Sequence, residues 1–112
     1  MKYAILVYET DAALDNRHSP EYWGAYRAYG ALLGERITKG AALEGIDTAT
    51  TIRLRDGEQL VEDGPFADTK ERLGGFYVVE ARDLDEALEM AAQCPSVKEG
   101  AVEVRPLMEM PS

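Results

Sequence analysis

Runs of apolar side chains predict where the strands of this chain lie. Residues 2–8 form a short continuous apolar run with β-branched and aromatic members, which is typical of a central strand buried on both faces. Residues 76–81 form a second such run, directly after Gly74 and Gly75. This glycine pair precedes a strand rather than a helix, so it indicates a β-bulge. Residues 101–107 alternate between apolar and polar side chains, which predicts a closing strand.

The segment after the first strand has helical spacing. Ser19 followed by Pro20 is typical of an N-cap and the first turn of a helix. The helix is predicted to continue until Lys39 and Gly40 end it. The face that packs on the sheet carries apolar side chains at helical spacing: Tyr22, Tyr26, Tyr29 and Leu33, with Ile37 beside them.

A second helix is predicted near the end of the chain. Asp83 is its expected N-cap, and Glu86 at the third helical position makes a variant of the capping box. Its buried stripe is expected to consist of Leu84, Leu88 and Ala91. The helix should stop before Pro95.

A β-hairpin is predicted between the two helices. Residues 48–55 alternate between β-branched and polar side chains, and Asp56-Gly57 is a strong two-residue turn signal before the strand 58–62. The element order strand, helix, three strands, helix, strand indicates an α+β fold, a ferredoxin-like sandwich built as a split βαβ unit with an extra β-hairpin. Both helices then cover one sheet face. The other face needs a cover, so we expect a homodimer.

Composition and charge narrow the function classes. The chain has 112 residues, 46% of them hydrophobic, which suits one domain over residues 1–112. Its net charge is −9, and residues 57–112 hold 13 acidic and 5 basic side chains. Because no cluster of Lys and Arg occurs, direct binding to nucleic acid or to an anionic membrane is not expected.

Cysteine usage and missing motifs exclude further classes. Cys94 is the only cysteine, so neither an internal disulfide nor a multi-cysteine zinc site is expected. No run approaches the ~20 apolar residues that span a bilayer, and a cytoplasmic protein is predicted. No metal-ligand spacing or nucleotide-binding glycine motif occurs, so no metal and no cofactor are predicted.

The most informative stretch is DGPFADTKE at residues 63–71, followed by LGGFY at 73–77. It resembles the DGPF signature of the YCII-related family, and the likeness extends to the opening strand, the start of the second helix and the closing VEVRPLM at 102–108. The resemblance implies a bacterial, ferredoxin-like protein paired as a dimeric α+β barrel, with a pocket between sheet and helices. Some relatives resemble enzymes of small organic molecules, and others accompany sigma factors in transcriptional regulation.

Two residues are candidates for acid–base catalysis. Asp63 begins the rigid turn made by Gly64 and Pro65. It either caps this turn or holds its carboxylate at a pocket mouth as a general base. His18 is the only imidazole; it is either solvated in its loop or acts as a general acid or base near neutral pH.

The predicted ligand-binding residues come from the motif and from the first helix. They are Pro65, Phe66 and Lys70 of the motif, together with Tyr26 and Arg27. Lys70 either forms a local ion pair with Glu71 or binds an anionic group. Arg27 either lies along the helix surface or contacts an anion or an aromatic ring. The tyrosines of this helix can serve as core packing or can line a pocket.

These observations leave two functions open. In the first, the homodimer binds a small organic ligand in its pocket, with acid–base chemistry centred on Asp63. In the second, the protein is a non-catalytic regulatory module linked to sigma-factor-dependent transcription. The acidic face of the second helix would then dock a basic partner; it carries Asp83, Asp85, Glu86 and Glu89.

Overall fold

The computed structural model describes residues 1–111. Along the chain it contains β1 (Lys2–Thr10), α1 (Asp11–Asp15), α2 (Pro20–Leu33), β2 (Ile37–Ala42), β3 (Thr50–Arg55), β4 (Glu58–Asp63), β5 (Glu71–Glu80), α3 (Leu84–Ala92) and β6 (Ala101–Pro106). Single 3-10 turns at Asn16–His18, Gly34–Arg36, Ile46–Thr48 and Pro95–Val97 connect these elements. The fold is therefore a mixture of helices and antiparallel strands, as the element pattern predicted.

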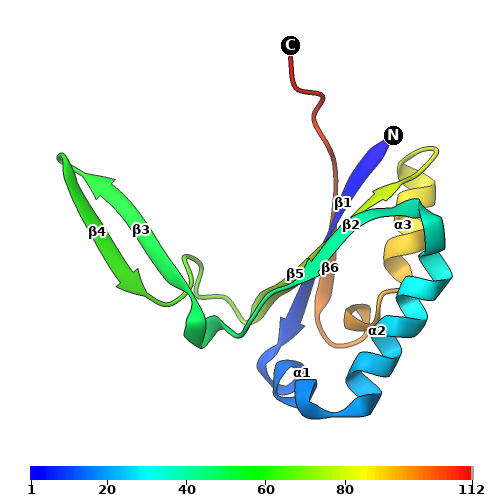
Figure 1. Ribbon diagram of the computed structural model, residues 1–112, viewed down its shortest axis with the longest axis horizontal. Helices are drawn as coiled ribbons and strands as arrows, with labels where there is room; N and C mark the ends of the chain where they lie inside the picture. The colour runs from blue at the N-terminus through cyan, green and yellow to red at the C-terminus, as the bar shows by residue number, and fades with distance from the viewer. Residues whose placement is uncertain (112) are drawn as a thin grey trace.

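The main sheet is antiparallel, with the strand order β2-β5-β1-β6. β1 pairs with β5 on one side and β6 on the other, so the prediction of a central first strand is confirmed. α2 and α3 both lie on one face of the sheet (Figure 1). The core between the two layers contains Tyr3, Ile5, Val7 and Val79 from the sheet, Tyr29 and Leu33 from α2, and Ala87, Met90 and Ala91 from α3.

β1 is buried on one face only. Alternate side chains from Tyr3 to Glu9 point into the helix-covered layer and are buried, whereas those from Ala4 to Thr10 are half-buried. The predicted burial on both faces therefore holds for one face. The register skips Gly74 between Val7 and Tyr8, which confirms the predicted β-bulge.

The predicted length of the first long helix is wrong. α2 begins as expected, because the Ser19 hydroxyl accepts a hydrogen bond from the amide of Tyr22 at 3.2 Å. It ends at Leu33 rather than at Lys39, because Gly34 turns into a positive φ of 57°. The following residues form β2, in which Ile37 pairs with Val79 of β5. The fourth strand of the main sheet is thus β2, and the hairpin is additional to the sheet.

α3 confirms its predicted start and corrects its predicted face. The carboxylate of Asp83 accepts a hydrogen bond from the Glu86 amide at 2.9 Å, and Glu86 in turn accepts one from the amide of Arg82. Leu84 and Leu88 are each 47% exposed, so they do not form the buried stripe. Its buried side chains are Ala87, Met90 and Ala91. Ala87, Met90 and Ala91 follow the i, i+3, i+4 spacing of one helix face, and Leu84 and Leu88 lie at one edge of it.

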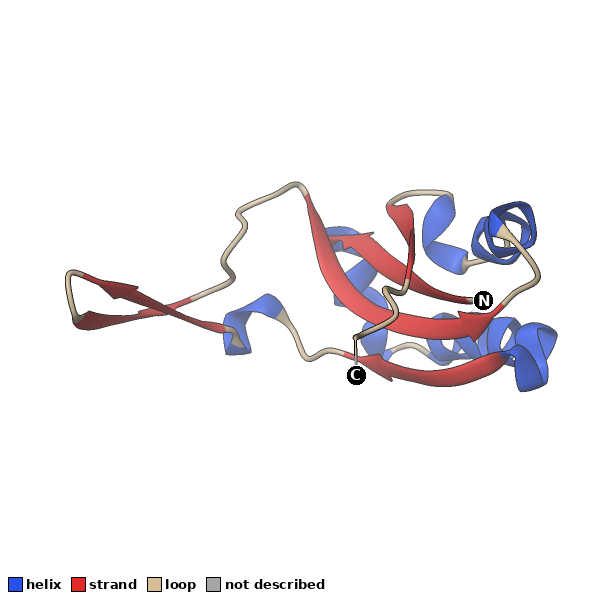
Figure 2. Cartoon of the chain, turned by 90° about the horizontal axis from the view of Figure 1, so that it is seen from above, coloured by secondary structure: helices blue, strands red, loops and turns tan. Residues whose placement is uncertain are grey.

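β3 and β4 form a separate two-stranded hairpin. Asp56 and Gly57 have positive φ angles of 50° and 78°, as a type I′ turn requires, so the predicted hairpin is confirmed. Both views show it projecting away from the sheet and the helices (Figures 1 and 2). The radius of gyration is 15.9 Å, whereas a compact chain of this length has one of ~13 Å. The projecting hairpin accounts for this elongation.

Candidate functional site

A carboxylate lies where the pattern of β1 places core side chains. Glu9 follows Tyr3, Ile5 and Val7 on the helix-covered face, and only 4% of it is exposed. Burial of an ionised carboxylate is costly unless hydrogen bonds and an opposite charge compensate it. The surroundings of Glu9 supply both.

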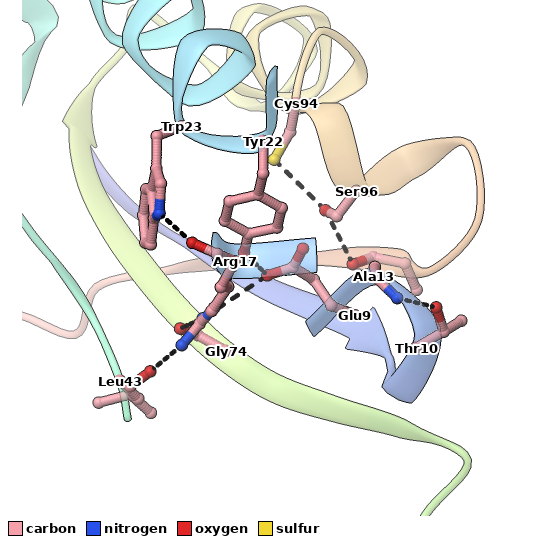
Figure 3. Close-up of polar contacts among 11 residues, drawn as sticks. Glu9, Thr10, Ala13, Arg17, Tyr22, Trp23, Leu43, Gly74, Cys94 and Ser96 are labelled. Atoms are coloured by element: carbon pink, nitrogen blue, oxygen red, sulfur yellow. Dashed lines mark hydrogen bonds and ion pairs between the residues drawn. The ribbon is translucent and has the colours of Figure 1, made fainter. Parts of the chain in front are cut away.

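Tyr22 and Arg17 surround this carboxylate (Figure 3). The Tyr22 hydroxyl donates to Oε1 of Glu9 at 2.5 Å and accepts from Nε of Arg17 at 3.1 Å. Nη2 of Arg17 lies 3.7 Å from the same Oε1. Among residues 1–111, the hydrogen bond and the ion pair to Glu9 both involve Oε1.

Arg17 also joins three segments that are distant in sequence. Its Nη2 donates to the Gly74 carbonyl at 2.9 Å, and its Nη1 donates to the Leu43 carbonyl. Its own carbonyl accepts a hydrogen bond of 2.6 Å from the indole of Trp23. The guanidinium lies 5.8 Å from the ring centres of both Tyr22 and Trp23, close enough for cation–π attraction. Arg17 therefore fixes the aromatic side chains relative to the β5 bulge.

The bulge needs glycine for this arrangement. A Cβ at Gly74 would lie 3.0 Å from Oε1 of Glu9 and 3.1 Å from Nη2 of Arg17. A Cβ at Gly75 would lie 2.8 Å from the backbone oxygen of Ala41. The Gly74-Gly75 pair thus leaves room for the carboxylate and guanidinium and lets β2 approach β5.

These residues form the polar end of a cavity of about 240 Å³. Apart from Glu9 and Arg17, its walls are aromatic, aliphatic or glycine: Val7, Tyr22, Trp23, Tyr26, Ala41, Ala42, Gly74, Gly75, Phe76 and Tyr77. For scale, a cavity of ~150 Å³ accommodates benzene. The volume therefore suits a molecule with one substituted ring.

Two tyrosines that border this cavity keep their phenol protons. Burial, followed by the hydrogen bond to Glu9, raises the pKa of Tyr22 to about 12. Burial, followed by the charge of Glu9, raises the pKa of Tyr26 still further. The buried Tyr26 hydroxyl lies near Ser96 and Cys94 but forms no hydrogen bond of good geometry with any described residue. Because water does not reach this oxygen, it is not in position to contact a ligand in the cavity.

The donor atoms at this site suit an organic ligand. The carboxylate of Glu9, the guanidinium of Arg17 and the phenol of Tyr22 can recognise hydroxyl and carbonyl groups on a ring. Across residues 1–111, no group of three or more His, Cys, Asp or Glu side chains is arranged to hold a metal ion.

The comparisons with known proteins concern the whole chain. The YCII-related domain family matches residues 1–111. The chain belongs to the YCII-related family. An uncharacterized protein of Rhizobium meliloti is 36% identical over 114 residues, covering 96% of this chain and 92% of the relative.

A solved structure shares the fold of this YCII-related chain. It is the 5-chloro-2-hydroxyhydroquinone dehydrochlorinase of Burkholderia phenoliruptrix, in complex with 2,5-dihydroxybenzoquinone. The TM-score is 0.62 at 21% identity, and the match covers 98% of this chain and 96% of the other. At this identity the likeness concerns the fold. In the described part of the chain, no helix is both long and apolar enough to cross a membrane.

The DGPF segment of the YCII-related chain lies at the base of the hairpin. Asp63 is exposed at the end of β4, where it pairs with Thr50. Pro65 and Phe66 line a separate hollow of about 470 Å³, together with Tyr8 of β1 and residues of the connections to β2 and β5. Phe66 is 74% exposed and stacks on Arg53 at 4.9 Å. The motif therefore lies apart from the cavity that contains Glu9.

Of the other predicted residues, Tyr26 borders one of these two regions and Arg27, Lys70 and His18 border neither. Tyr26 lines the Glu9 cavity, as described above. Arg27 is exposed on α2, and Lys70 is exposed just before β5. His18 is also exposed, and its Nδ1 lies 2.7 Å from the carbonyl of Asp15. The structure places His18 beside α1 and Asp63 on the projecting hairpin (Figure 1), so it does not bring these two residues together.

Sequence reasoning missed Glu9 and Arg17. The alternation of β1 contained a signal for Glu9, because continuing the buried positions Tyr3, Ile5 and Val7 by two residues places a carboxylate on the core face. Arg17 had no comparable signal. Its partners Leu43 and Gly74 are 26 and 57 residues away in sequence, and only the folded chain brings them together.

Proposed function

We propose that this YCII-related protein binds a small hydroxylated or carbonyl-bearing cyclic molecule in the cavity beside Glu9, which serves as the proton acceptor. One observation carries the proposal: a carboxylate that is only 4% exposed has a phenol and a guanidinium on Oε1 and borders an aromatic cavity of about 240 Å³. Carboxylates are effective general bases when a ligand proton lies within hydrogen-bond reach.

The ligand class follows from the walls of the cavity. Aromatic side chains favour a flat ring, whereas Arg17 favours oxygen acceptors on it. A fold neighbour binds 2,5-dihydroxybenzoquinone, a molecule of this kind. When a protonated ligand hydroxyl enters, its proton would pass to Glu9, and the resulting negative charge would be stabilised by Arg17.

We further propose that the functional unit is a homodimer. The strand order β2-β5-β1-β6, with both helices on one face, matches a ferredoxin-like sandwich. The uncovered face carries Leu6, Tyr8, Phe76 and Val78, all only half-buried in a single chain. Stacking two such faces would give the dimeric α+β barrel and would remove this apolar surface from water.

Trp23 provides a direct test of the ligand site. It is the only tryptophan and it borders the cavity, so a bound quinone should quench its fluorescence. We expect 2,5-dihydroxybenzoquinone to bind the wild-type protein and to bind Glu9→Gln at least about tenfold more weakly. Asp63→Asn is the matched control, because it makes the same kind of change in the carboxylate at the hairpin.

The two candidate carboxylates give opposite outcomes in this titration. Unchanged binding by Glu9→Gln would refute the role of Glu9. Loss of binding only in Asp63→Asn would move the site to the DGPF hollow. Circular dichroism of both variants separates lost binding from lost folding.

The alternative of a regulatory module predicts that the acids of α3 dock a basic partner. Glu86 on this surface already forms an ion pair with Arg82 at 3.1 Å and caps the helix start. No comparable local role explains the buried Glu9 and its cavity, and for this reason we favour ligand binding. Capture of a sigma factor that depends on Glu89 and is unaffected by Glu9→Gln would instead support the regulatory function.

A further inference from the structure

The β3–β4 hairpin, residues 50–63 and hereafter the arm, is amphipathic. Ile52 pairs with Val61 across the two strands, and Leu54 follows Ile52 on the same side. These side chains are 59%, 61% and 67% exposed, respectively. The opposite side carries the charged side chains Arg53, Arg55, Glu58 and Glu62, together with Thr51 and Leu60. The same face as Ile52 carries Gln59 near the tip and Thr50 and Asp63 at the base, so its middle part is apolar and open to water.

The arm lacks support from the rest of its own chain. Within residues 1–111, β3 and β4 contact each other extensively but make at most marginal contacts with the other elements. An isolated two-stranded hairpin is only marginally stable in water. An arm of this kind therefore needs a surface outside its own chain to hold its apolar face.

The base of the arm is fixed in position. The Gly64 amide donates to the Ala49 carbonyl at 2.8 Å, and the Thr51 hydroxyl donates to the Gly64 carbonyl at 2.8 Å. Arg53 stacks on Phe66. The DGPF segment thus sets the direction in which the arm leaves the sheet, which suits a structural element built to reach another molecule.

The size of the uncovered surfaces favours a second copy of this chain as the molecule that the arm contacts. Four strands spaced about 4.8 Å apart, with six to nine paired residues rising about 3.3 Å each, give the uncovered sheet face a flat footprint of roughly 400–550 Å². The same spacings give one face of the arm about 200 Å². A stable interface buries about 800 Å² of accessible surface per partner. The arm enlarges the flat footprint of the sheet face by about a third to a half, so it would contribute substantially to an interface with a second copy.

The apolar surface is also continuous between these two parts. The 470 Å³ hollow at the base of the arm is lined by Tyr8 and Leu73 of the sheet and by Pro65 and Phe66 of the motif. A single docked body can therefore contact the sheet face, the hollow and the arm together. In a twofold symmetric dimer, each chain would contact its partner with its own arm and would be contacted by the arm of the partner.

We propose that the apolar face of the arm, formed by Ile52, Leu54 and Val61, packs on a second copy of this chain, so that each protomer holds its partner with its hairpin. This inference rests on the proposed homodimer and assigns it a second contact beyond the stacked sheets. It also explains the DGPF motif as the base that orients the arm.

Paired double variants test the arm. Ile52→Asp/Val61→Asp places two charges on the apolar face, and the control Arg55→Gln/Leu60→Asp makes the same change of two charge units on the opposite face, away from the base of the arm. By sedimentation equilibrium, we expect the first variant to raise the dimer dissociation constant at least about 100-fold. The control should remain within about threefold of the wild-type value. Titration with 2,5-dihydroxybenzoquinone through Trp23, together with circular dichroism, verifies that each variant is folded.

Hydrogen exchange of the unmodified protein gives an independent readout. Amides of residues 50–63 should exchange slowly at concentrations at which the protein is dimeric and quickly on dilution to the monomer. Two results would refute the arm contact: a dimer that both variants leave equally intact, or arm amides that exchange freely within the wild-type dimer. Either result would still be compatible with a dimer of stacked sheets. A wild-type protein that is monomeric at all concentrations would overturn both the arm contact and the stacked dimer.

Discussion

At the Glu9 cavity a polar side chain is buried, whereas along the arm apolar side chains are exposed. Both regions reverse the usual distribution of apolar side chains in the core and polar side chains at the surface, and each reversal costs free energy. Around Glu9 the cost is offset within the chain by Tyr22 and Arg17. For Ile52 and Val61 nothing within residues 1–111 offsets it. The comparison teaches that the buried charge of the cavity is compensated inside a single chain, whereas the exposed face of the arm is left for the partner contact that we propose.

The largest expected difference comes from the same substitution made in the core behind the cavity and in the arm. Ile5 is fully buried and Ile52 is 59% exposed. Ile5→Ala should lower the free energy of unfolding by about 2–5 kcal/mol because it leaves a cavity in the core. Ile52→Ala should lower it by less than about 1 kcal/mol at protein concentrations low enough for single chains. Urea denaturation measures both. Equal losses in dilute solution would contradict the description of the arm as unsupported.

Removal of Arg17 should have the next largest effect. Arg17→Ala deletes the contacts to Leu43, Gly74 and Glu9 and leaves a buried carboxylate without its charge partner. Because Arg17 is itself partly exposed, we expect a loss of about 2 kcal/mol in unfolding free energy. The double variant Arg17→Ala/Glu9→Gln should regain part of it, since the unpaired charge is then absent. If the loss of unfolding free energy in the double variant equals the sum of the losses in Arg17→Ala and Glu9→Gln, the Glu9–Arg17 pair is not coupled.

Gly74→Ala should act on the site more than on the fold. Its Cβ would lie 3.0 Å from Oε1 of Glu9 and 3.1 Å from Nη2 of Arg17. These groups would have to shift by a few tenths of an ångström, and we expect quinone binding to weaken about tenfold with a loss of stability near 1 kcal/mol. Gly24→Ala on α2 is the control, because a Cβ there meets nothing within 4 Å. It should stabilise the protein by about 0.5–1 kcal/mol.

The smallest expected effect is a pH dependence at the cavity. Burial raises the pKa of Tyr22 to about 12 in the folded chain, whereas the unfolded chain titrates near the ordinary value of ~10. The folded state therefore binds this proton more tightly. The stability it contributes is fully present below pH ~10 and disappears as the pH rises toward ~12. Tyrosinate absorbance of the wild type and Tyr22→Phe should differ by one group that titrates in this range. Identical titrations of the two proteins would argue against the buried Tyr22–Glu9 bond.

Most secondary structure was predictable because its signals are local. The Asp56-Gly57 turn, the Asp83 cap and the bulge at Gly74 each depend on a few adjacent residues. The errors occurred where distant contacts decide. Ile37 continues the helical stripe of α2 in the sequence, yet Gly34 ends the helix and pairing with Val79 places Ile37 in a strand.

The predicted site divided for a similar reason. Tyr26 was recognised as a possible pocket residue from its helix. The DGPF motif attracted attention because its residues are unusual as a group, but its position depends on how the arm leaves the sheet. Glu9 and Arg17 are ordinary residues in ordinary local patterns. They form a site only because β1, the turn after α1 and the β5 bulge meet.

By itself the sequence determined the family, the α+β element pattern, the hairpin and an acidic chain with one cysteine, since all of these depend on residue identity and short spacings. Only the tertiary structure decided that Glu9 is buried, that Arg17 joins three segments, and that the hairpin leaves the sheet as an exposed arm. The physical reason is that the burial and charge pairing of a side chain depend on neighbours many residues away, which the chain acquires only when its layers pack.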